Sequence, residues 1–201
     1  GGLERTAKRF GTAIVGGDIA SHAGKLAINV ALLGETRGRR PIRRNGAKAG
    51  DLIAVTGPLG GSLLGKHLRF TPRVKEALEL GRRFDVHAMI DLSDGLATDL
   101  GHLCRESGAG AVLDPRAIPV SADAKRMSRK DRRSPLDHAL TDGEDYELLF
   151  TLPAAQGDRL RRSRKGIVIG EIVGIEGMWT KDSQGRLHPL KVRGWEHRFR
   201  S

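Results

Sequence analysis

In the stretch Ile90-Asp91-Leu92-Ser93-Asp94-Gly95-Leu96, a leucine and a serine separate two carboxylates, and a glycine follows the second. The apolar residues 88–90 lead into this stretch, and leucines recur at positions 96, 100 and 103. The short apolar run is typical of a buried strand, and the leucine spacing is that of one helix face. The pattern predicts a strand, then a polar turn, then an amphipathic helix.

The polar turn supports two interpretations. Asp91 and Asp94 could converge on one divalent cation, because hard cations take carboxylate oxygens as ligands. The backbone N–H groups at the start of the helix would then favour an anion in the same space. Alternatively, Ser93 or Asp94 simply caps the helix. Because D-x-x-D-G is short and common, the motif alone favours capping, and the rest of the chain has to decide.

Length and composition limit the possible classes of protein. The chain has 201 residues, of which 38% are hydrophobic, so it can bury a core and form one or two domains. Its one cysteine, Cys104, excludes an internal disulfide and fits a reducing compartment. Cys104 falls on the apolar side of the helix after residue 95, which predicts a buried structural thiol. We see no apolar run of membrane-spanning length and no signal peptide, and we expect a cytoplasmic protein.

The formal net charge of +11 comes largely from basic clusters at residues 37–44, 125–133 and 159–165. Such a charge attracts nucleic acid or phosphorylated small molecules. The clusters lack the interleaved aromatic side chains of single-strand binders, and no recognition module is visible. We therefore expect most of these side chains to form a solvated surface, with no nucleic acid and no membrane as partner.

The first part of the chain predicts a helix at residues 3–10 and strands at residues 12–15 and 26–33. Between the strands lies a glycine-rich turn, Val15-Gly16-Gly17-Asp18, which carries a carboxylate. Two strands and one helix make a poor independent domain. We interpret residues 1–46 as the tail of a domain whose beginning is missing, and the chain as a fragment.

The rest of the chain alternates strands and helices. A strand at residues 52–56 enters Gly57-Pro58-Leu59-Gly60-Gly61, which lacks the Gly-Lys-Ser/Thr of a phosphate-binding P-loop and is interpreted as a plain turn before a helix at 62–68. Further expected elements are helices at 74–83 and 154–164, strands at 111–113, 146–152 and 167–173, and a hairpin turn at 181–185. This alternation predicts an α/β or α+β layered fold.

A second acidic cluster, Asp142, Glu144 and Asp145, comes directly before the expected strand at 146–152. We do not expect these carboxylates in the core. They could bind a cation, accept hydrogen bonds from a ligand, or form an acidic turn that balances nearby arginines. At the end of the chain, Trp195 and Phe199 predict either an aromatic anchor that packs down or a surface that stacks on a flat ligand ring.

Five motifs, in their order and rough spacing, resemble the thiamine-monophosphate kinase family. They are Val15-Gly16-Gly17-Asp18, Arg44-Asn45-Gly46-Ala47 with Gly50-Asp51, Asp91-Leu92-Ser93-Asp94-Gly95-Leu96, Gly143-Glu144-Asp145-Tyr146-Glu147-Leu148, and the closing Gly194-Trp195-Glu196-His197-Arg198-Phe199. The family belongs to the aminoimidazole-ribonucleotide synthetase-like ATP-binding superfamily. The resemblance implies a remnant of an N-terminal ATP-binding domain at 1–46 and a C-terminal mixed-sheet α/β domain at 47–201, with a homodimer formed through the N-terminal domain.

The resemblance also implies the reaction and its residues. ATP and thiamine monophosphate would give ADP and thiamine diphosphate, with Mg²⁺, in the cleft between the two domains. By similarity, ATP would contact Gly17, Asp18, Arg44 and Ser93; Mg²⁺ would be held by Asp18, Asp91 and Asp94; and the thiamine phosphate would contact Glu144 and Trp195. The attacking phosphate oxygen is already largely ionised, so we assign no general base.

The chain also departs from the family pattern. A Gly-Asp-Asp motif in the family's first half has no counterpart here, which suggests that roughly a hundred residues are missing upstream, about one domain. Ile19 stands where the family usually has threonine. We therefore expect little or no kinase activity from this fragment alone. The alternatives are another ATP-using enzyme of the superfamily, or a non-catalytic basic module that binds nucleotide or nucleic acid.

Overall fold

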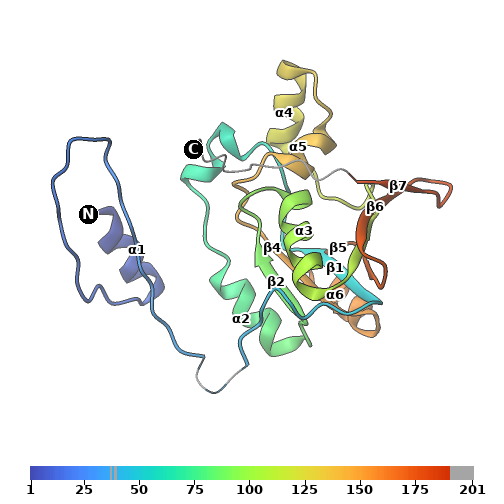
Figure 1. Ribbon diagram of the computed structural model, residues 1–201, viewed down its shortest axis with the longest axis horizontal. Helices are drawn as coiled ribbons and strands as arrows, with labels where there is room; N and C mark the ends of the chain where they lie inside the picture. The colour runs from blue at the N-terminus through green and yellow to red at the C-terminus, as the bar shows by residue number, and fades with distance from the viewer. Residues whose placement is uncertain (37, 39, 191–201) are drawn as a thin grey trace. The chain divides into compact units, whose positions relative to one another are not determined.

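Strands β1 to β7 form one mixed sheet in the order β2-β4-β1-β5-β3-β6-β7. The computed structural model describes residues 1–36, 38 and 40–190, and it contains two compact units, Gly1–Gly38 and Arg39–Ser201. The sheet belongs to the second unit (Figure 1). Its neighbouring strands are antiparallel except for β3 and β6, which are parallel. The predicted layered α/β fold is confirmed.

Helix α2 and strand β5 begin and end at the predicted residues, and the other elements differ from the prediction to varying degrees. The strands are β1 Asp51–Val55, β2 Ala88–Asp91, β3 Gly110–Leu113, β4 Leu148–Pro153, β5 Ile167–Val173, β6 Gly177–Lys181 and β7 Leu187–Pro189. The α-helices are α1 Gly2–Phe10, α2 Val74–Arg83, α3 Leu96–Ser107, α4 Ala122–Asp131, α5 Pro135–Thr141 and α6 Gly157–Ser163. The 3₁₀ helices are η1 Ser62–Leu64, η2 Lys66–Leu68 and η3 Ala154–Gln156.

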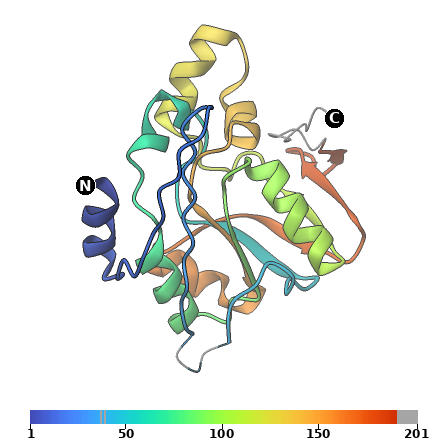
Figure 2. The same cartoon turned by 60° about the vertical axis from the view of Figure 1, so that its left-hand side comes forward.

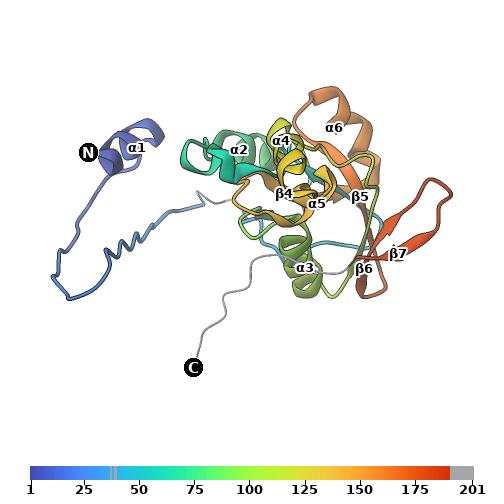
Figure 3. The ribbon, with the colours of Figure 1, turned by 90° about the horizontal axis from the view of Figure 1, so that it is seen from above.

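Helices cover both faces of the sheet, as the view from above shows (Figure 3). Leucines 96, 100 and 103 of α3 pack with sheet residues such as Ile53 and Leu149 in the main core. On the opposite face, Leu80 of α2, Phe84 directly after it and Leu160 of α6 pack against Phe150 and Leu152 in a second core. Cys104 is buried beside the α3 leucines, as predicted, and burial raises the pKa of its thiol to about 11.

The first unit contains the predicted helix but neither predicted strand. Helix α1 ends at Phe10, and the next residue, Gly11, is its C-cap with a left-handed φ of 62°. Residues 12–15 and 26–33 form no strand among the described residues of this unit. An extended segment needs a neighbouring strand for its N–H and C=O groups, and the described part of Gly1–Gly38 offers none. The apolar Leu26, Ile28 and Leu32 are consequently exposed.

Some predicted elements of the second unit differ from the structure. The helix expected at 62–68 is two 3₁₀ turns, η1 and η2, because Gly65 between them has a φ of 124° that an α-helix does not admit. The strand expected from residue 146 begins at Leu148, after a turn described below. Helices α4 and α5 have no counterpart in the prediction; they pack on each other at one end of the sheet (Figure 2).

The connecting segment at residues 43–47 lies alongside the edge strand β2. The amide of Met89 donates to the Arg43 carbonyl at 3.0 Å, so the sheet edge is covered there. Gly46 lies so close to β2 that a Cβ on it would be 2.1 Å from the His87 carbonyl oxygen. This segment ends near the C-terminus of α3, where Ser107 Oγ accepts from the Ala47 amide at 3.2 Å. None of the helices among the described residues is long and apolar enough to cross a membrane.

Gly46→Ala should destabilise the chain by about 1–3 kcal/mol, the usual cost of forcing an atom into occupied space. The free energy of unfolding in urea measures this effect. Gly174→Ala is a matched control, because the nearest atom to its added Cβ is Ala49 Cβ at 3.8 Å. The control should change stability by less than about 0.5 kcal/mol. Equal effects of the two substitutions would contradict the close approach of residue 46 to β2.

Candidate active site

The turn after β2 carries Asp91, Ser93 and Asp94, and it does not cap α3 with a side chain. Gly95 is the N-cap residue of α3 and makes no side-chain cap hydrogen bond. Instead, the Asp99 carboxylate, one turn into the helix, accepts from the Asp94 amide at 3.0 Å. The interpretation that Ser93 or Asp94 caps the helix is therefore wrong, because the N-cap residue is Gly95 and no side chain caps α3.

A second turn, residues 143–147, joins the first through three backbone hydrogen bonds. Glu144 N donates to Ser93 O at 2.7 Å, Tyr146 N donates to Leu92 O at 2.8 Å, and Leu92 N donates to Glu147 O at 2.9 Å. The turns touch so closely that a Cβ at Gly143 would lie 2.6 Å from Ser93 O. Gly143 has a φ of 72°, which glycine adopts at low cost. Two acidic segments about fifty residues apart in the sequence thus form one site.

The carboxylates of this site act on the neighbouring Tyr146 hydroxyl. Burial raises the pKa of Tyr146, and the hydrogen bond to Glu144 and the charges of Glu144, Asp91 and Asp94 raise it further. Within the described ranges, the side chains of Asp91 and Asp94 form no hydrogen bond or ion pair. Asp91 is exposed, and Asp94 is half-buried. Hard, accessible oxygen donors of this kind fit a Mg²⁺ ion.

One group of side chains in the described part of the chain has metal-binding spacing. Asp94, Asp99 and His102 each offer a ligand atom, and these atoms lie within 4.8 Å of one another. The group shares Asp94 with the predicted metal pair, but Asp91 is not part of it. Asp94 is therefore the carboxylate at which the predicted pair and this group meet.

The glycine-rich turn after β1 binds the protein's own carboxylates. Gly60 N donates to both oxygens of Asp145, at 3.0 and 2.8 Å, and Gly61 N donates to Asp142 at 2.9 Å. Ser62 Oγ adds a second donor to Asp145 at 2.6 Å. These amides point at anions, but the anions are internal. The interpretation of this turn as a plain connection rather than a phosphate cradle is supported.

The expectation that Asp142, Glu144 and Asp145 stay out of the core is wrong for two of them. Asp145 is 2% exposed, and the side chain of Asp142 is 3% exposed. Burial raises the pKa of Asp145, against the hydrogen bonds from Ser62 and Gly60. These carboxylates can be buried because the glycine-rich turn supplies donors, which sequence spacing alone does not reveal.

Within the second unit, the structure brings four of the predicted site residues together and places Arg44 elsewhere. Ser93, Asp91, Asp94 and Glu144 come together at the two joined turns. Arg44 instead pairs with Glu106 at 3.2 Å, near the other end of α3, about 15 Å of helix away. Gly17 and Asp18 belong to the first unit, where both are exposed, and Trp195 lies outside the described residues.

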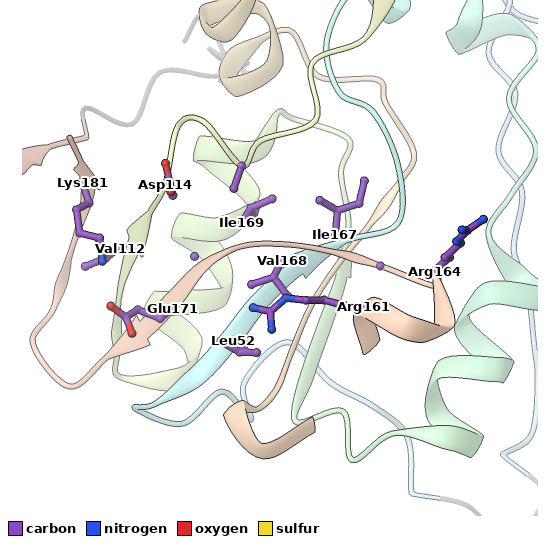
Figure 4. A pocket seen from close by; sticks show the side chains of 13 residues that line it. Leu52, Val112, Asp114, Arg161, Arg164, Ile167, Val168, Ile169, Glu171 and Lys181 are labelled. Carbon is purple, nitrogen blue, oxygen red and sulfur yellow. The ribbon is translucent and has the colours of Figure 1, made fainter. Parts of the chain in front are cut away.

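A groove of ≈ 720 Å³ lies elsewhere, along strand β5 (Figure 4). Leu52 and Val168 line it, and the Arg161 side chain lies beside them (Figure 4). Arg161 donates to Asp158 at 2.8 Å, so part of the positive charge near the groove is compensated. None of the predicted site residues lines this groove. The acidic turns and the groove are separate features of the molecule.

Comparison with known proteins identifies the family of this chain. Residues 42–177 match the family described as AIR synthase related protein, C-terminal domain, and the chain belongs to that family. Within it, the chain is similar to the thiamine-monophosphate kinase of Rhodopirellula baltica (strain DSM 10527 / NCIMB 13988 / SH1), with 38% identity over 199 residues. That match covers 98% of this chain and 62% of the relative, so the chain spans about three fifths of the relative's length.

Solved structures agree with this family. The structure of AaThiL complexed with AMPPCP and TMP matches with a TM-score of 0.66 and 30% identity, covering 78% of this chain and 54% of that one. The hydrogenase maturation protein HypE of E. coli matches with a TM-score of 0.63 at 17% identity, covering 78% of this chain and 53% of its own. The second likeness concerns the fold alone. The predicted resemblance to the thiamine-monophosphate kinases is confirmed.

Asp99→Asn should change the pH dependence of stability. Burial raises the pKa of Asp99 to about 7 in the folded chain, against opposing hydrogen bonds from the Asp94 and Ser93 amides and with a further rise from the charges of Asp94 and Asp91. The folded state therefore binds a proton that the unfolded state has lost, and stability falls as pH rises from about 4 to 7. The fall attributable to this group is a few kcal/mol at most, at about 1.4 kcal/mol per pH unit.

Urea unfolding with EDTA between pH 4.5 and 8 measures this effect as the difference between the two proteins. The asparagine keeps an oxygen acceptor for the Asp94 amide, and the variant should lose less stability than the parent as pH rises. Parallel pH profiles would contradict a native Asp99 that holds its proton near neutrality.

Proposed function

We propose that this chain is part of an ATP-dependent kinase that phosphorylates thiamine monophosphate to thiamine diphosphate. The observation that carries the proposal is the joining of the two acidic turns, which brings Asp91, Asp94 and Glu144 to one place. The 38% identity to a thiamine-monophosphate kinase supports this reaction over others of the superfamily. The chemistry is consistent, because phosphoryl transfer is catalysed mainly by positioning and by neutralising phosphate charge.

The proposed roles follow the resemblance. Asp91 and Asp94, with Asp18, would hold Mg²⁺, which supplies positive charge against the phosphate oxygens. Ser93, Gly17 and Asp18 would contact ATP, and the Arg44 guanidinium would contact its phosphates. Glu144 and Trp195 would contact the thiamine phosphate. No side chain has to remove a proton, because the attacking phosphate oxygen is largely ionised at neutral pH.

We further infer that the active protein is a homodimer joined through the part that contains Gly1–Gly38. The exposed Leu26, Ile28, Val30 and Leu32 alternate along the chain, as the buried face of a strand does. A partner that pairs with this segment would cover them. The cytoplasmic location expected from the sequence stays a prediction.

The basic surface gives limited support to nucleic-acid binding. Each of the three basic clusters contains paired cations: Arg44 with Glu106, Arg126 with Asp123, Arg133 with Asp142, and Lys165 with Glu79. Paired cations release fewer counterions from a nucleic acid. This observation favours the predicted solvated surface, and RNA binding that weakens steeply with salt would argue for the alternative.

In the full-length gene product, Asp91→Asn should lower the rate of ADP release with ATP and thiamine monophosphate by at least about 100-fold. Loss of a metal ligand removes charge stabilisation worth several kcal/mol. Asp91 is exposed, so the melting temperature should stay within a few degrees. Asp158→Asn, which removes an exposed carboxylate from α6, is the control and should keep full turnover.

Two outcomes of that comparison would contradict the proposal. One is full turnover in Asp91→Asn, and the other is turnover by the parent protein with a formylglycinamidine substrate but not with thiamine monophosphate. A loss of activity that follows a lowered melting temperature would assign Asp91 a structural role instead.

The 201-residue chain by itself should show little or no steady-state turnover. It spans 62% of the Rhodopirellula baltica relative, and we expect the remaining part to supply further metal and nucleotide contacts. Purified chain and full-length gene product are compared at equal concentration with ATP, Mg²⁺ and thiamine monophosphate. Equal turnover by the two proteins would show that the chain already holds the complete site.

A further inference from the structure

Residues 144–147 place alternate side chains on opposite sides of the segment. Glu144 and Tyr146 are half-buried beside the acidic turn, whereas Asp145 and Glu147 are 2% and 1% exposed. Both Glu144 and Tyr146 have a positive φ, 57° and 50°, which residues with a Cβ rarely adopt. Such a backbone persists only where its surroundings hold it, and this segment is held from both sides.

On the site side, Tyr146 holds Glu144. The Tyr146 hydroxyl donates to Glu144 Oε2 at 3.0 Å. The Tyr146 ring in turn stacks on Phe70, with centroids 4.0 Å apart and an angle of 18° between the ring planes. Phe70 lies between η2 and α2, in a segment distant in sequence from both acidic turns. The stack fixes the ring, and the ring fixes the direction of the hydroxyl.

On the inner side, Glu147 binds both ends of the segment that carries Phe70. Lys66 Nζ donates to Glu147 Oε1 at 3.1 Å. Arg73 forms a fork on the same carboxylate, with Nε at 2.8 Å from Oε2 and Nη2 at 2.6 Å from Oε1. Thr56 Oγ1 adds a fourth donor at 2.7 Å. Residues 66–73 therefore form a clamp, attached at both ends to Glu147 and stacked in the middle on Tyr146.

The donors of the clamp stabilise the ionised form of the buried Glu147 carboxylate. Burial alone would raise the pKa of Glu147, but the hydrogen bonds from Arg73 and Thr56 and the charge of Lys66 outweigh it, and the pKa of Glu147 is lowered. Arg73 also donates to Glu76 on α2 at 3.3 Å, which ties the clamp to that helix. A paired, buried carboxylate of this kind resists rearrangement, because loss of either partner leaves a charge without compensation.

We propose that Tyr146 is a positioning residue for Glu144, and that Phe70 and the Arg73–Glu147 pair support it through the clamp. The inference rests on the proposed function, in which Glu144 contacts the thiamine phosphate. A free glutamate side chain samples many rotamers, and it would have to be ordered each time the substrate binds. The hydrogen bond from Tyr146 orders the Glu144 side chain before the substrate binds, which lowers the entropy cost of binding. Because Glu144 contacts the thiamine phosphate in the proposed function, this gain applies to the thiamine substrate and not to ATP.

The test compares Michaelis constants for the two substrates in the full-length gene product. Tyr146→Phe keeps the stacked ring and removes only the hydroxyl. We expect the KM for thiamine monophosphate to rise about 5- to 20-fold, while the KM for ATP stays within twofold and the melting temperature is unchanged. Phe70→Leu, which removes the stack, should give the same split between the two constants. Arg116→Gln is the control, since it removes an exposed guanidinium from Asp114 and should leave both constants unchanged.

A readout without turnover separates this inference from the proposed function. In crystals of Tyr146→Phe, the Glu144 carboxylate should leave its parent position or occupy several. Failure of the parent protein to phosphorylate thiamine monophosphate would overturn the proposed function, and the crystal comparison would still decide the inference. A Glu144 that keeps one unchanged position in the variant overturns the inference. So does an unchanged KM for thiamine monophosphate, or an equal rise in both constants.

Discussion

Three backbone hydrogen bonds between residues 92–93 and 144–147 are the constraint on which the candidate site depends. They join the end of the edge strand β2 to the segment that enters β4, its neighbour in the sheet. Because the bonds are between main-chain groups, they fix the path of both turns regardless of the side chains. The glycines at 95 and 143 allow this contact, since an added Cβ at either position would meet backbone of the facing turn or of α5.

The carboxylates of the site fall into two groups that differ in their hydrogen-bond partners. The buried Asp142, Asp145 and Glu147 accept hydrogen bonds from the glycine-rich turn and from Thr56, Lys66 and Arg73. Asp91 is exposed and Asp94 is half-buried, and within the described ranges their side chains form no hydrogen bond or ion pair. The first group holds the backbone in place by satisfied hydrogen bonds. The second group keeps oxygen atoms free for a cation, as the proposed reaction requires.

The sequence predicted most of the sheet and the acidic turn, because both depend on local patterns. Helix α2 and strand β5 lie at the predicted residues 74–83 and 167–173, where apolar spacing is regular. Prediction failed where distant residues decide. The Asp145 and Asp142 carboxylates are buried because amides some eighty residues away receive them. Strands at 12–15 and 26–33 did not form because an extended segment also needs a neighbour, which the local pattern does not guarantee.

The same reasoning explains the site residues that were predicted and those that were missed. Ser93 and Glu144 were predicted as site residues from two separate motifs. The backbone hydrogen bond that joins them cannot be predicted from the sequence pattern. The Arg73–Glu147 fork joins residues 74 positions apart; Glu147 was quoted only as part of a motif, and Arg73 was not singled out from the sequence. The hydrogen bond from the Asp94 amide to the Asp99 carboxylate was also missed, because Asp99 was not singled out from the sequence.

The central claim, that the turn after β2 holds a divalent cation for phosphoryl transfer, is tested most directly by locating the ion. Crystals of the full-length gene product grown with Mn²⁺ and a non-hydrolysable ATP analogue would show the metal by its anomalous scattering. The account predicts a manganese peak within coordinating distance of Asp91 and Asp94 carboxylate oxygens, about 2.1 to 2.3 Å for hard oxygen ligands. A bound nucleotide whose manganese ions contact neither of these residues would contradict it.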